Sequence, residues 1–220
     1  MGTFSRDLTS YSLDSCAPVR LRGSRGIKRA MDFAGALLLI VLFAPLLLLI
    51  FVLVLLSDGP PVLYRRRVVG PRGVFDAFKF RTMCRNADRM LEADAGLRSA
   101  FRENFKLKSD PRITGLGQVL RKFSLDELPQ LFNVLAGQMS LVGPRMITMP
   151  ELEKYGEYKE LLLSVKPGLT GYWQVHGRQE VSYAERVQMD IAYIRNWSLR
   201  LDLNLLWLTP LRVLRGKGAY

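Results

Sequence analysis

The hydrophobic pattern of the chain is dominated by one long apolar run. From Ala34 to Leu56 the sequence carries 23 residues without a charge. As a straight helix, a run of this length measures about 35 Å, which is enough to cross the hydrocarbon core of a bilayer. A cleavable signal peptide would have a shorter apolar run followed by a small-residue cleavage site. The pattern therefore predicts a membrane helix.

Two features of this run favour a hairpin over a plain span. Pro45 lies in its middle, where it removes a backbone hydrogen bond and bends a helix. Both flanks are basic, and the positive-inside rule places basic flanks in the cytoplasm. The basic residues are Arg20, Arg22, Arg25, Lys28 and Arg29 before the run and Arg65, Arg66, Arg67 and Arg72 after it. A re-entrant helix satisfies both observations, but the residues alone leave hairpin and single span equally open.

Weaker periodicities predict the elements of the remaining chain. Short strands are expected at Val62 to Tyr64 and at Val74 to Phe80, after a Gly-Pro loop. Helices are expected over residues 85–107, 125–135, 150–163, 183–197 and 199–214. The last of these mixes apolar and charged side chains, which suits an interfacial helix and a core helix about equally.

Composition narrows the classes of protein that remain. Lys and Arg exceed Asp and Glu by 32 to 20, a net charge of +12, which favours anionic partners such as nucleic acid, acidic lipid or phosphorylated small molecules. Cys16 and Cys84 show no paired spacing, which argues against a disulfide framework and a cysteine-rich zinc site. The single histidine, His176, excludes a zincin motif. Any catalysis is expected to depend on carboxylates, Arg, Lys and a hard cation.

The most informative stretch is Ser124-Leu125-Asp126-Glu127-Leu128-Pro129-Gln130. Ser124 followed by Glu127 has the spacing of a capping box, a purely structural interpretation. Adjacent carboxylates at a helix start can also divide two catalytic tasks, since one attacks phosphorus and the other holds a divalent cation. The two interpretations are compatible on the same residues.

Cationic side chains recur in turn-like settings along the chain. An Arg beside Gly or Pro tends to sit on a constrained loop and can present its guanidinium to phosphate oxygens, although each one taken singly also fits a solvated surface charge. The five settings are Lys79-Phe80-Arg81, Asp110-Pro111-Arg112, Arg121-Lys122, Gly143-Pro144-Arg145 and Gly177-Arg178. Together with the paired acids they predict a phosphate-binding site.

In order and spacing, these blocks resemble a known family. The chain is similar to the bacterial sugar transferases, the monotopic polyprenyl-phosphate glycosyl-1-phosphate transferases, over about residues 27 to 220. The blocks that carry the resemblance are Lys79 to Met83, Asp110 to Thr114, Ser124 to Asn133, Ser140 to Arg145, Lys166 to Gly171 and Tyr193 to Asp202. Longer members carry a polytopic membrane region upstream, and the chain resembles the short form.

The resemblance implies a fold and a location. The expected fold is α+β and mostly α, with a re-entrant membrane helix kinked at Pro45, amphipathic interfacial helices and a small β element. Residues 1–26 are expected to form a flexible basic leader, 27–58 the membrane helix and 59–220 a catalytic domain. The expected location is the bacterial inner membrane, with the catalytic domain on the cytoplasmic face.

The resemblance also implies an activity. A sugar 1-phosphate, galactose or glucose, passes from a UDP-sugar to undecaprenyl phosphate with release of UMP, as the first membrane step of exopolysaccharide or glycan synthesis. Asp126 is the expected nucleophile and carries the sugar phosphate as an aspartyl intermediate, and Mg²⁺ is expected at Asp126 and Glu127. Basic positions of the family and of the cationic turns predict substrate binding by Lys79, Arg81, Arg112, Arg121, Arg145 and Arg178.

Two other kinds of protein explain part of the sequence. A membrane-tethered basic binding protein without catalysis accounts for the charge and the apolar run, but leaves Asp126-Glu127 in its surroundings unexplained. A metal-dependent nucleotide-sugar hydrolase would share the acids and cations, but would have no need of a membrane hairpin. No nucleic-acid-binding signature is present, so nucleic acid is not an expected partner. Membrane lipids are expected partners, and a homodimer is compatible with the sequence.

Overall fold

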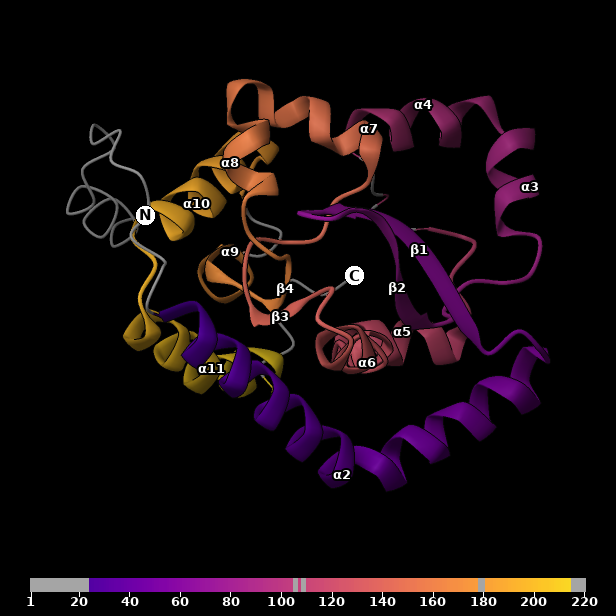
Figure 1. The fold of residues 1–220 in the computed structure, drawn as a ribbon. Coiled ribbons are helices and arrows are strands. Elements are labelled where there is room, and N and C mark those ends of the chain that lie inside the picture. Colours follow the sequence, from indigo (N-terminus) through magenta and orange to yellow (C-terminus); the bar gives the residue numbers. More distant parts are fainter. Residues whose placement is uncertain (1–23, 105–106, 108–109, 178–180, 215–220) are drawn as a thin grey trace.

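The computed structural model of the protein describes residues 24–104, 107, 110–177 and 181–214. The fold is α+β and mostly helical, as the sequence predicts (Figure 1). Its elements, in chain order, are α2 (Ser24–Asp58), β1 (Leu63–Gly70), β2 (Gly73–Phe80), α3 (Ala87–Ala93), α4 (Ala95–Asn104), α5 (Gly115–Lys122), the 3-10 turn η1 (Leu125–Glu127), α6 (Gln130–Leu135), β3 (Ser140–Val142), α7 (Met149–Leu152), the 3-10 segment η2 (Glu153–Tyr158), α8 (Lys159–Leu163), β4 (Gly168–Thr170), α9 (Tyr172–His176), α10 (Tyr183–Arg195) and α11 (Leu199–Leu214).

The apolar run forms one helix, α2, of 35 residues with Pro45 inside it. Figure 1 shows α2 sharply bent near its middle, so that both arms turn toward the rest of the protein. A proline in a helix interior removes a hydrogen bond and clashes with the preceding turn, which accounts for the bend. By length and composition the helix can cross a membrane, and only 11% of its most apolar stretch is buried.

Polar contacts hold the first arm of α2 against the domain. Lys28 forms an ion pair of 2.5 Å with Asp202 of α11. Arg29 donates to the carbonyls of Val134 and Leu135 at 2.6 and 2.7 Å, which satisfies acceptors at the end of α6. The buried carboxylate of Asp32 accepts hydrogen bonds from the Ser140 hydroxyl and the Leu141 N–H, both at 2.9 Å. These contacts fix the position at which the apolar helix leaves the domain.

The second arm is held mainly by apolar packing. Ile50 and Val54 form a small buried cluster with Val62, Phe80 and Leu120. At the end of the helix, Arg81 donates to the carbonyls of Asp58 and Gly59. The same guanidinium forms an ion pair of 3.0 Å with the Asp58 carboxylate. The two arms are therefore both anchored to the domain, on either side of the bend.

Strands β1 and β2 form an antiparallel hairpin that is longer than the sequence predicts. Their register runs from Leu63 opposite Phe80 to Gly70 opposite Gly73, and Gly73 has a φ of +100°, which the tight turn requires. The prediction ended the first strand at Tyr64, because the run of three arginines from Arg65 to Arg67 hides the alternation. Strands β3 and β4 pair in parallel and were not predicted, because three residues are too short to show a period.

Three predicted helices are interrupted. The helix expected over residues 85–107 is two helices, α3 and α4, separated by Asp94 in extended backbone. The helix over 125–135 begins as the 3-10 turn η1, and α6 starts only after Pro129. The helix over 150–163 contains Gly156 at a φ of 51°, which breaks it into α7, η2 and α8. By contrast, α10 has the predicted apolar face, since Val187, Ile191 and Ile194 are all buried.

One large core connects the membrane arm with the rest of the domain. It extends from Ala36 of α2 through Val142 of β3 to Ile191 of α10 and Leu205 of α11. Because α2 and α11 contribute to the same core, their relative position is set by packing as well as by the Lys28–Asp202 pair.

Candidate active site

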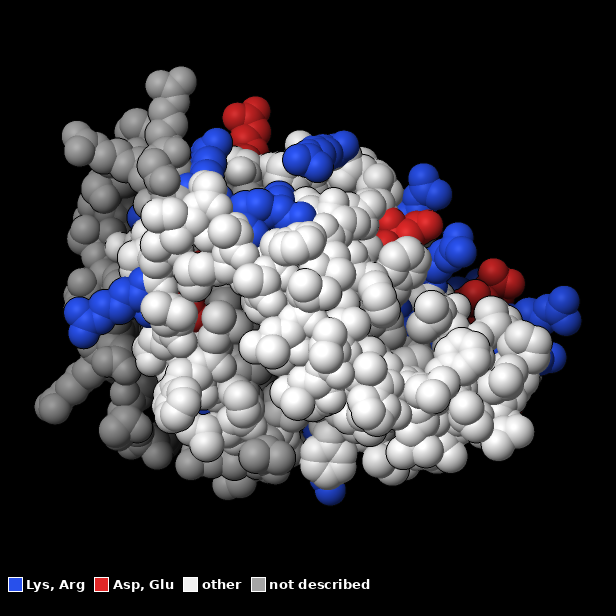
Figure 2. Space-filling model, turned by 60° about the horizontal axis from the view of Figure 1, so that its bottom comes forward, with Lys and Arg blue, Asp and Glu red and all other residues white. Residues whose placement is uncertain are grey.

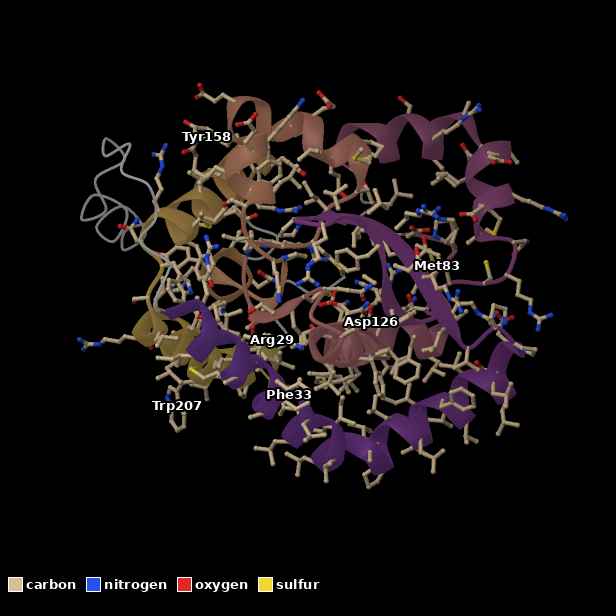
Figure 3. All side chains as sticks on the ribbon, in the orientation of Figure 1. Arg29, Phe33, Met83, Asp126, Tyr158 and Trp207 are labelled. Carbon is tan, nitrogen blue, oxygen red and sulfur yellow. The ribbon has the colours of Figure 1, made fainter. Side chains whose placement is uncertain are left out.

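Asp126 lies near the centre of the molecule, in the turn η1 just before α6 (Figure 3). Its side chain is buried, and it lines a cleft of about 1890 Å³. Ser124, which precedes the turn, has a φ of 55° and a ψ of 23°, a left-handed conformation that a serine rarely adopts. Its hydroxyl makes no capping hydrogen bond, so the predicted capping box is wrong. Such strained backbone is concentrated at functional sites, where surrounding contacts maintain it.

Glu127 is held by two cations from other elements. Lys79 of β2 places its ammonium 2.6 Å from Glu127 Oε1, and Arg145 places its guanidinium 3.7 Å from the same oxygen. Burial alone would raise the pKa of Glu127, but Lys79 and Arg145 outweigh that effect and lower the pKa to about 2. Glu127 is therefore a permanently charged carboxylate inside the cleft.

The neighbouring Asp126 experiences the opposite shift. Its pKa is raised above the ordinary value, chiefly because burial disfavours its charge. The charge of Glu127 adds to the effect, and Lys79 opposes it from 4.0 Å, beyond hydrogen-bond distance. Two adjacent carboxylates thus have different environments. A poorly solvated carboxylate gains more by sharing its electron pair with an electrophile than a well-solvated one does, so Asp126 is the better candidate nucleophile of the two.

The loop that carries Arg145 is shaped by close contact between two of the sequence blocks. A Cβ on Gly168 would lie 2.1 Å from the Gly143 nitrogen, and one on Gly171 would lie 2.2 Å from the Gly143 oxygen. Gly143 donates to the Thr170 carbonyl at 2.9 Å, and Gly168 donates to the Pro144 carbonyl at 2.8 Å. Only glycine permits this approach of the two backbones, and Arg145 follows directly from it.

Two further blocks meet on the other side of the dyad. Met83 and Ile113 form an antiparallel bridge, and the Thr82 carbonyl accepts a hydrogen bond from the Thr114 N–H at 3.0 Å. The Thr82 hydroxyl in turn accepts from Arg121 Nε at 2.9 Å. Arg121 lines the cleft, where burial lowers its pKa, and the charge of Asp126 acts against that effect. The structure therefore brings Lys79, Arg121 and Arg145 together around the two acids.

The other predicted substrate-binding residues are placed differently. Arg81 and Arg112 both line the cleft, and their guanidinium groups also contact groups of the protein, although Nη1 of Arg81 is buried without a hydrogen-bond partner. Arg81 binds the end of α2, and Arg112 makes a two-pronged contact with the Asp110 carboxylate at 2.7 and 2.8 Å. These contacts hold both side chains at the walls of the cleft, and substrate binding by Arg81 and Arg112 stays a prediction. Arg178 lies outside the described residues.

A second ionic cluster borders the cleft, and the sequence did not reveal it. The buried carboxylate of Glu151 contacts Arg66 at 2.8 Å and Arg186 at 4.0 Å. Arg186 and Arg145 lie 5.0 and 5.3 Å from the ring of Trp173, within cation–π range. These residues come from separate elements and have no shared motif, so no sequence signal identifies them as a group.

The candidate metal ligands are the two adjacent acids. Within the described ranges, no cluster of three or more His, Cys, Asp or Glu side chains has the arrangement of a metal site. Mg²⁺ is commonly held by one or two carboxylates together with substrate phosphates and water, and Asp126 with Glu127 supplies such a pair. The ionised state of Glu127 fits this role.

The similarity to known proteins covers most of the chain. A family model described as bacterial sugar transferase matches residues 23–216. The undecaprenyl-phosphate galactose phosphotransferase of Salmonella typhimurium is 45% identical over 204 residues, and the match covers 90% of this chain and 43% of that protein.

A relative of similar length and a less similar, longer relative also match most of the chain. The exopolysaccharide production protein ExoY of Rhizobium meliloti is 46% identical over 198 residues, covering 88% of each chain. The UDP-glucose:undecaprenyl-phosphate glucose-1-phosphate transferase of Escherichia coli is 38% identical over 206 residues, covering 90% of this chain and 42% of that protein. The chain thus spans less than half the length of two of these relatives and most of the third.

Proposed function

The chain belongs to the bacterial sugar transferase family, and from that premise we propose that it transfers a sugar 1-phosphate from a UDP-sugar to undecaprenyl phosphate. The names of the Salmonella and Escherichia coli relatives specify undecaprenyl phosphate and galactose or glucose, and the name of ExoY specifies exopolysaccharide production. The observation that carries the proposal is the buried Asp126 beside the permanently ionised Glu127, with Lys79, Arg121 and Arg145 around them.

The first step is attack of an Asp126 carboxylate oxygen on the phosphorus that bears the sugar. The bond from that phosphorus to the bridging oxygen of the diphosphate breaks, and UMP leaves with the electron pair. Asp126 then carries the sugar phosphate as a covalent intermediate. The raised pKa of Asp126, caused mainly by burial, supports this assignment over Glu127, whose charge is already compensated by Lys79.

The second step returns the enzyme to its starting state. An oxygen of undecaprenyl phosphate attacks the same phosphorus, the bond to Asp126 breaks, and the carboxylate is regenerated. The product is the sugar linked to the lipid through a diphosphate. Both steps place negative charge on the same phosphoryl oxygens, so the same cations can serve each one.

The cations of the cleft have distinct tasks in this scheme. Lys79 is 2.6 Å from Glu127 and 4.0 Å from Asp126, so it can neutralise charge on either side of the transferred group. Arg121 and Arg145 both line the cleft, and both charges act on Asp126. Mg²⁺ would be held by Asp126 and Glu127 and would supply further neutralisation of phosphate charge.

The membrane attachment of this enzyme is part of the proposal. The bend at Pro45 and the anchoring of both arms of α2 to one domain support a re-entrant helix rather than a span. On α11, Leu203, Trp207 and Leu211 are exposed at spacings of four residues and supply an apolar stripe for the interface. Figure 3 shows Trp207 projecting outward. A catalytic domain on the cytoplasmic face of the inner membrane would have access to UDP-sugars and Mg²⁺.

The decisive experiment measures UMP release from UDP-galactose, UDP-glucose and other UDP-sugars in detergent with Mg²⁺. With undecaprenyl phosphate we expect continuous UMP release from one sugar. Without the lipid we expect at most one UMP per protein molecule. The Asp126→Asn variant is the control for contaminating hydrolases. Absence of UMP from every sugar in folded protein would refute the proposal, and continuous release without lipid would indicate a hydrolase.

A further inference from the structure

The cleft over Asp126 extends beyond the space that a sugar nucleotide needs. Its volume of about 1890 Å³ exceeds the ~300–1,000 Å³ of a typical small-molecule site. Its lining includes the dyad, Leu128, Leu169 and Thr170 as well as residues of α2 and α11, and Thr170 contacts Thr209 of α11. The part of the cleft on these two helices, the α2–α11 groove, is lined by Gly35, Leu38, Leu39 and Phe43 of α2 and by Leu206, Thr209, Pro210, Arg212 and Val213 of α11.

The spacing of these residues shows that each helix offers one continuous face to the groove. On α2, Gly35, Leu39 and Phe43 recur every four residues. On α11, Leu206, Thr209, Pro210 and Val213 are spaced so that they share one side of the helix, and Arg212 also borders the groove. Such intervals place side chains on one side of a helix. Seven of the nine lining residues have no hydrogen-bonding side chain. The Thr209 hydroxyl is occupied by the Leu205 carbonyl and Thr170, and Arg212 adds a charged side chain on α11.

The walls of the groove are fixed in the free protein. The Lys28–Asp202 ion pair of 2.5 Å joins the first arm of α2 to the start of α11. Thr209 bonds to Thr170 of β4 at 2.9 Å, close to the loop that carries Arg145. A ligand in the groove would therefore meet a preformed apolar surface, with little ordering cost on binding.

One end of the groove opens on an uncharged surface. Leu38, on its lining, is 67% exposed and is continuous with the other exposed apolar side chains of α2. Figure 2 shows this side of the molecule as a broad area without Lys, Arg, Asp or Glu, with charged side chains mainly at its margins. The other end reaches the acidic dyad and its cations. The groove thus connects a surface suited to lipid with a site suited to phosphate.

We propose that the α2–α11 groove binds the first isoprene units of the polyprenyl acceptor, with the acceptor phosphate at Asp126. This inference rests on the proposed function and adds the location of the lipid chain. An amphiphile with a phosphate head and a long apolar tail matches both ends of the groove. Because the chain enters from the apolar side of α2, the acceptor never has to leave the membrane completely.

A pair of substitutions on α2 tests the groove. Leu38→Trp adds bulk at the mouth of the groove, whereas Val41→Trp places the same tryptophan side chain outside it. Both positions are 67% exposed, so neither change is expected to disturb folding. We expect Leu38→Trp to raise KM for undecaprenyl phosphate by about tenfold, the loss expected when two methylene groups lose their apolar contact. Val41→Trp should leave KM within about twofold of the wild type.

A second variant and two readouts separate the groove from other effects. Val213→Trp narrows the groove from α11 and should also raise KM for undecaprenyl phosphate. With geranyl phosphate as acceptor, whose short tail leaves the mouth of the groove empty, Leu38→Trp should match the wild type. Exchange of labelled UMP into the UDP-sugar, which needs no lipid, should be unchanged in both variants.

The outcomes are distinguishable. If wild-type protein transfers sugar phosphate but Leu38→Trp and Val213→Trp behave like Val41→Trp with undecaprenyl phosphate, the groove is not the lipid site. A loss of UMP exchange in the groove variants would also overturn the inference, because it would show a disturbed donor site. A wild-type protein with no transfer at all would instead refute the proposed function.

Discussion

Two buried ionic clusters lie side by side in this protein, and they differ in how completely their carboxylates are satisfied. In the cluster of Glu151, the carboxylate contacts Arg66 at 2.8 Å and also accepts from the N–H and hydroxyl of Thr148, both at 2.9 Å. In the cluster of Asp126, the Lys79 ammonium lies 2.6 Å from Glu127 Oε1 but 4.0 Å from Asp126 Oδ2.

The number of donors around a buried carboxylate distinguishes a structural acid from a reactive one. A buried carboxylate with several donors has its charge compensated, and removing it leaves those donors without a partner. A buried carboxylate whose cation is bound to a neighbour retains an uncompensated electron pair that can react. We therefore expect substitutions in the Glu151 cluster to change stability first, and substitutions around Asp126 to change turnover first.

The strongest test of the contrast is Asp126→Asn. The amide keeps the size of the side chain but cannot form the proposed covalent intermediate. We expect kcat for UMP release to fall at least about 10³-fold, or about 4 kcal/mol in activation free energy, with no loss of thermal stability. Single-turnover UMP release and circular dichroism in detergent measure the two properties. Activity within tenfold of the wild type would remove Asp126 from the role of nucleophile.

The next largest effect is expected for Lys79→Met. Removing the ammonium withdraws a charge that opposes the negative phosphoryl group, and kcat should fall by about 10²-fold. Lys79 lowers the pKa of both Asp126 and Glu127, so its removal raises both. The acidic limb of the pH–rate profile should therefore move to higher pH.

A matched control for this substitution is Lys159→Met, which removes an ammonium paired with Glu153 at the surface. It should change neither kcat nor the pH–rate profile. If the acidic limb of Lys79→Met coincides with that of the wild type, the ionisation seen in the profile does not belong to the dyad.

Glu151→Gln tests the structural cluster. The neutral side chain leaves Arg66 without its anion, whereas Arg186 keeps the charge of Asp190 nearby. We expect a loss of about 2–3 kcal/mol in the free energy of unfolding, below the ~3–5 kcal/mol of fully buried pairs because a quarter of the Arg66 side chain is exposed. Glu153→Gln, two residues away and 74% exposed, should change stability by less than about 0.5 kcal/mol. Equal effects of the two variants in thermal unfolding would contradict the assignment.

The sequence predicted one of these clusters and not the other for a physical reason. Asp126 and Glu127 are adjacent, and their block keeps a recognisable order with Lys79 and Arg145. Arg66, Glu151 and Arg186 are separated by 85 and 35 positions and meet only through folding. Local patterns report local neighbours, so an isolated charged residue carries no information about a distant partner.

The same limit explains the successes and failures in the fold. The apolar run of α2 and the periodic face of α10 were predicted, since each persists over several turns. The division at Asp94 and the parallel pairing of β3 with β4 were not predicted, because they depend on contacts rather than on period. The contacts of Arg81 with the end of α2 were also not predicted, because they join residues that are distant in the sequence.

The smallest expected effect concerns Asp190, an acid on the edge of the Glu151 cluster. It is fully buried, accepts a hydrogen bond from the Tyr155 hydroxyl at 2.8 Å, and burial raises its pKa to about 6. Since the folded pKa lies above the ordinary 3.8, the folded protein binds this proton more tightly than the unfolded chain does. The contribution of Asp190 to stability is therefore greatest below about pH 4 and is lost as the pH rises through about 6.

Asp190→Asn should remove that dependence. The amide oxygen can still accept from Tyr155, so the loss of a charge-assisted bond partly offsets the relief of a buried charge. We therefore expect the free energy of unfolding at pH 7 to increase by about 1 kcal/mol. In thermal unfolding between pH 4 and 6, the wild type should lose stability from this group while the variant does not, and turnover should stay within about threefold. A wild-type and a variant curve that run parallel over this range would show that Asp190 is ionised in the folded protein throughout, and that this cluster compensates both of its acids.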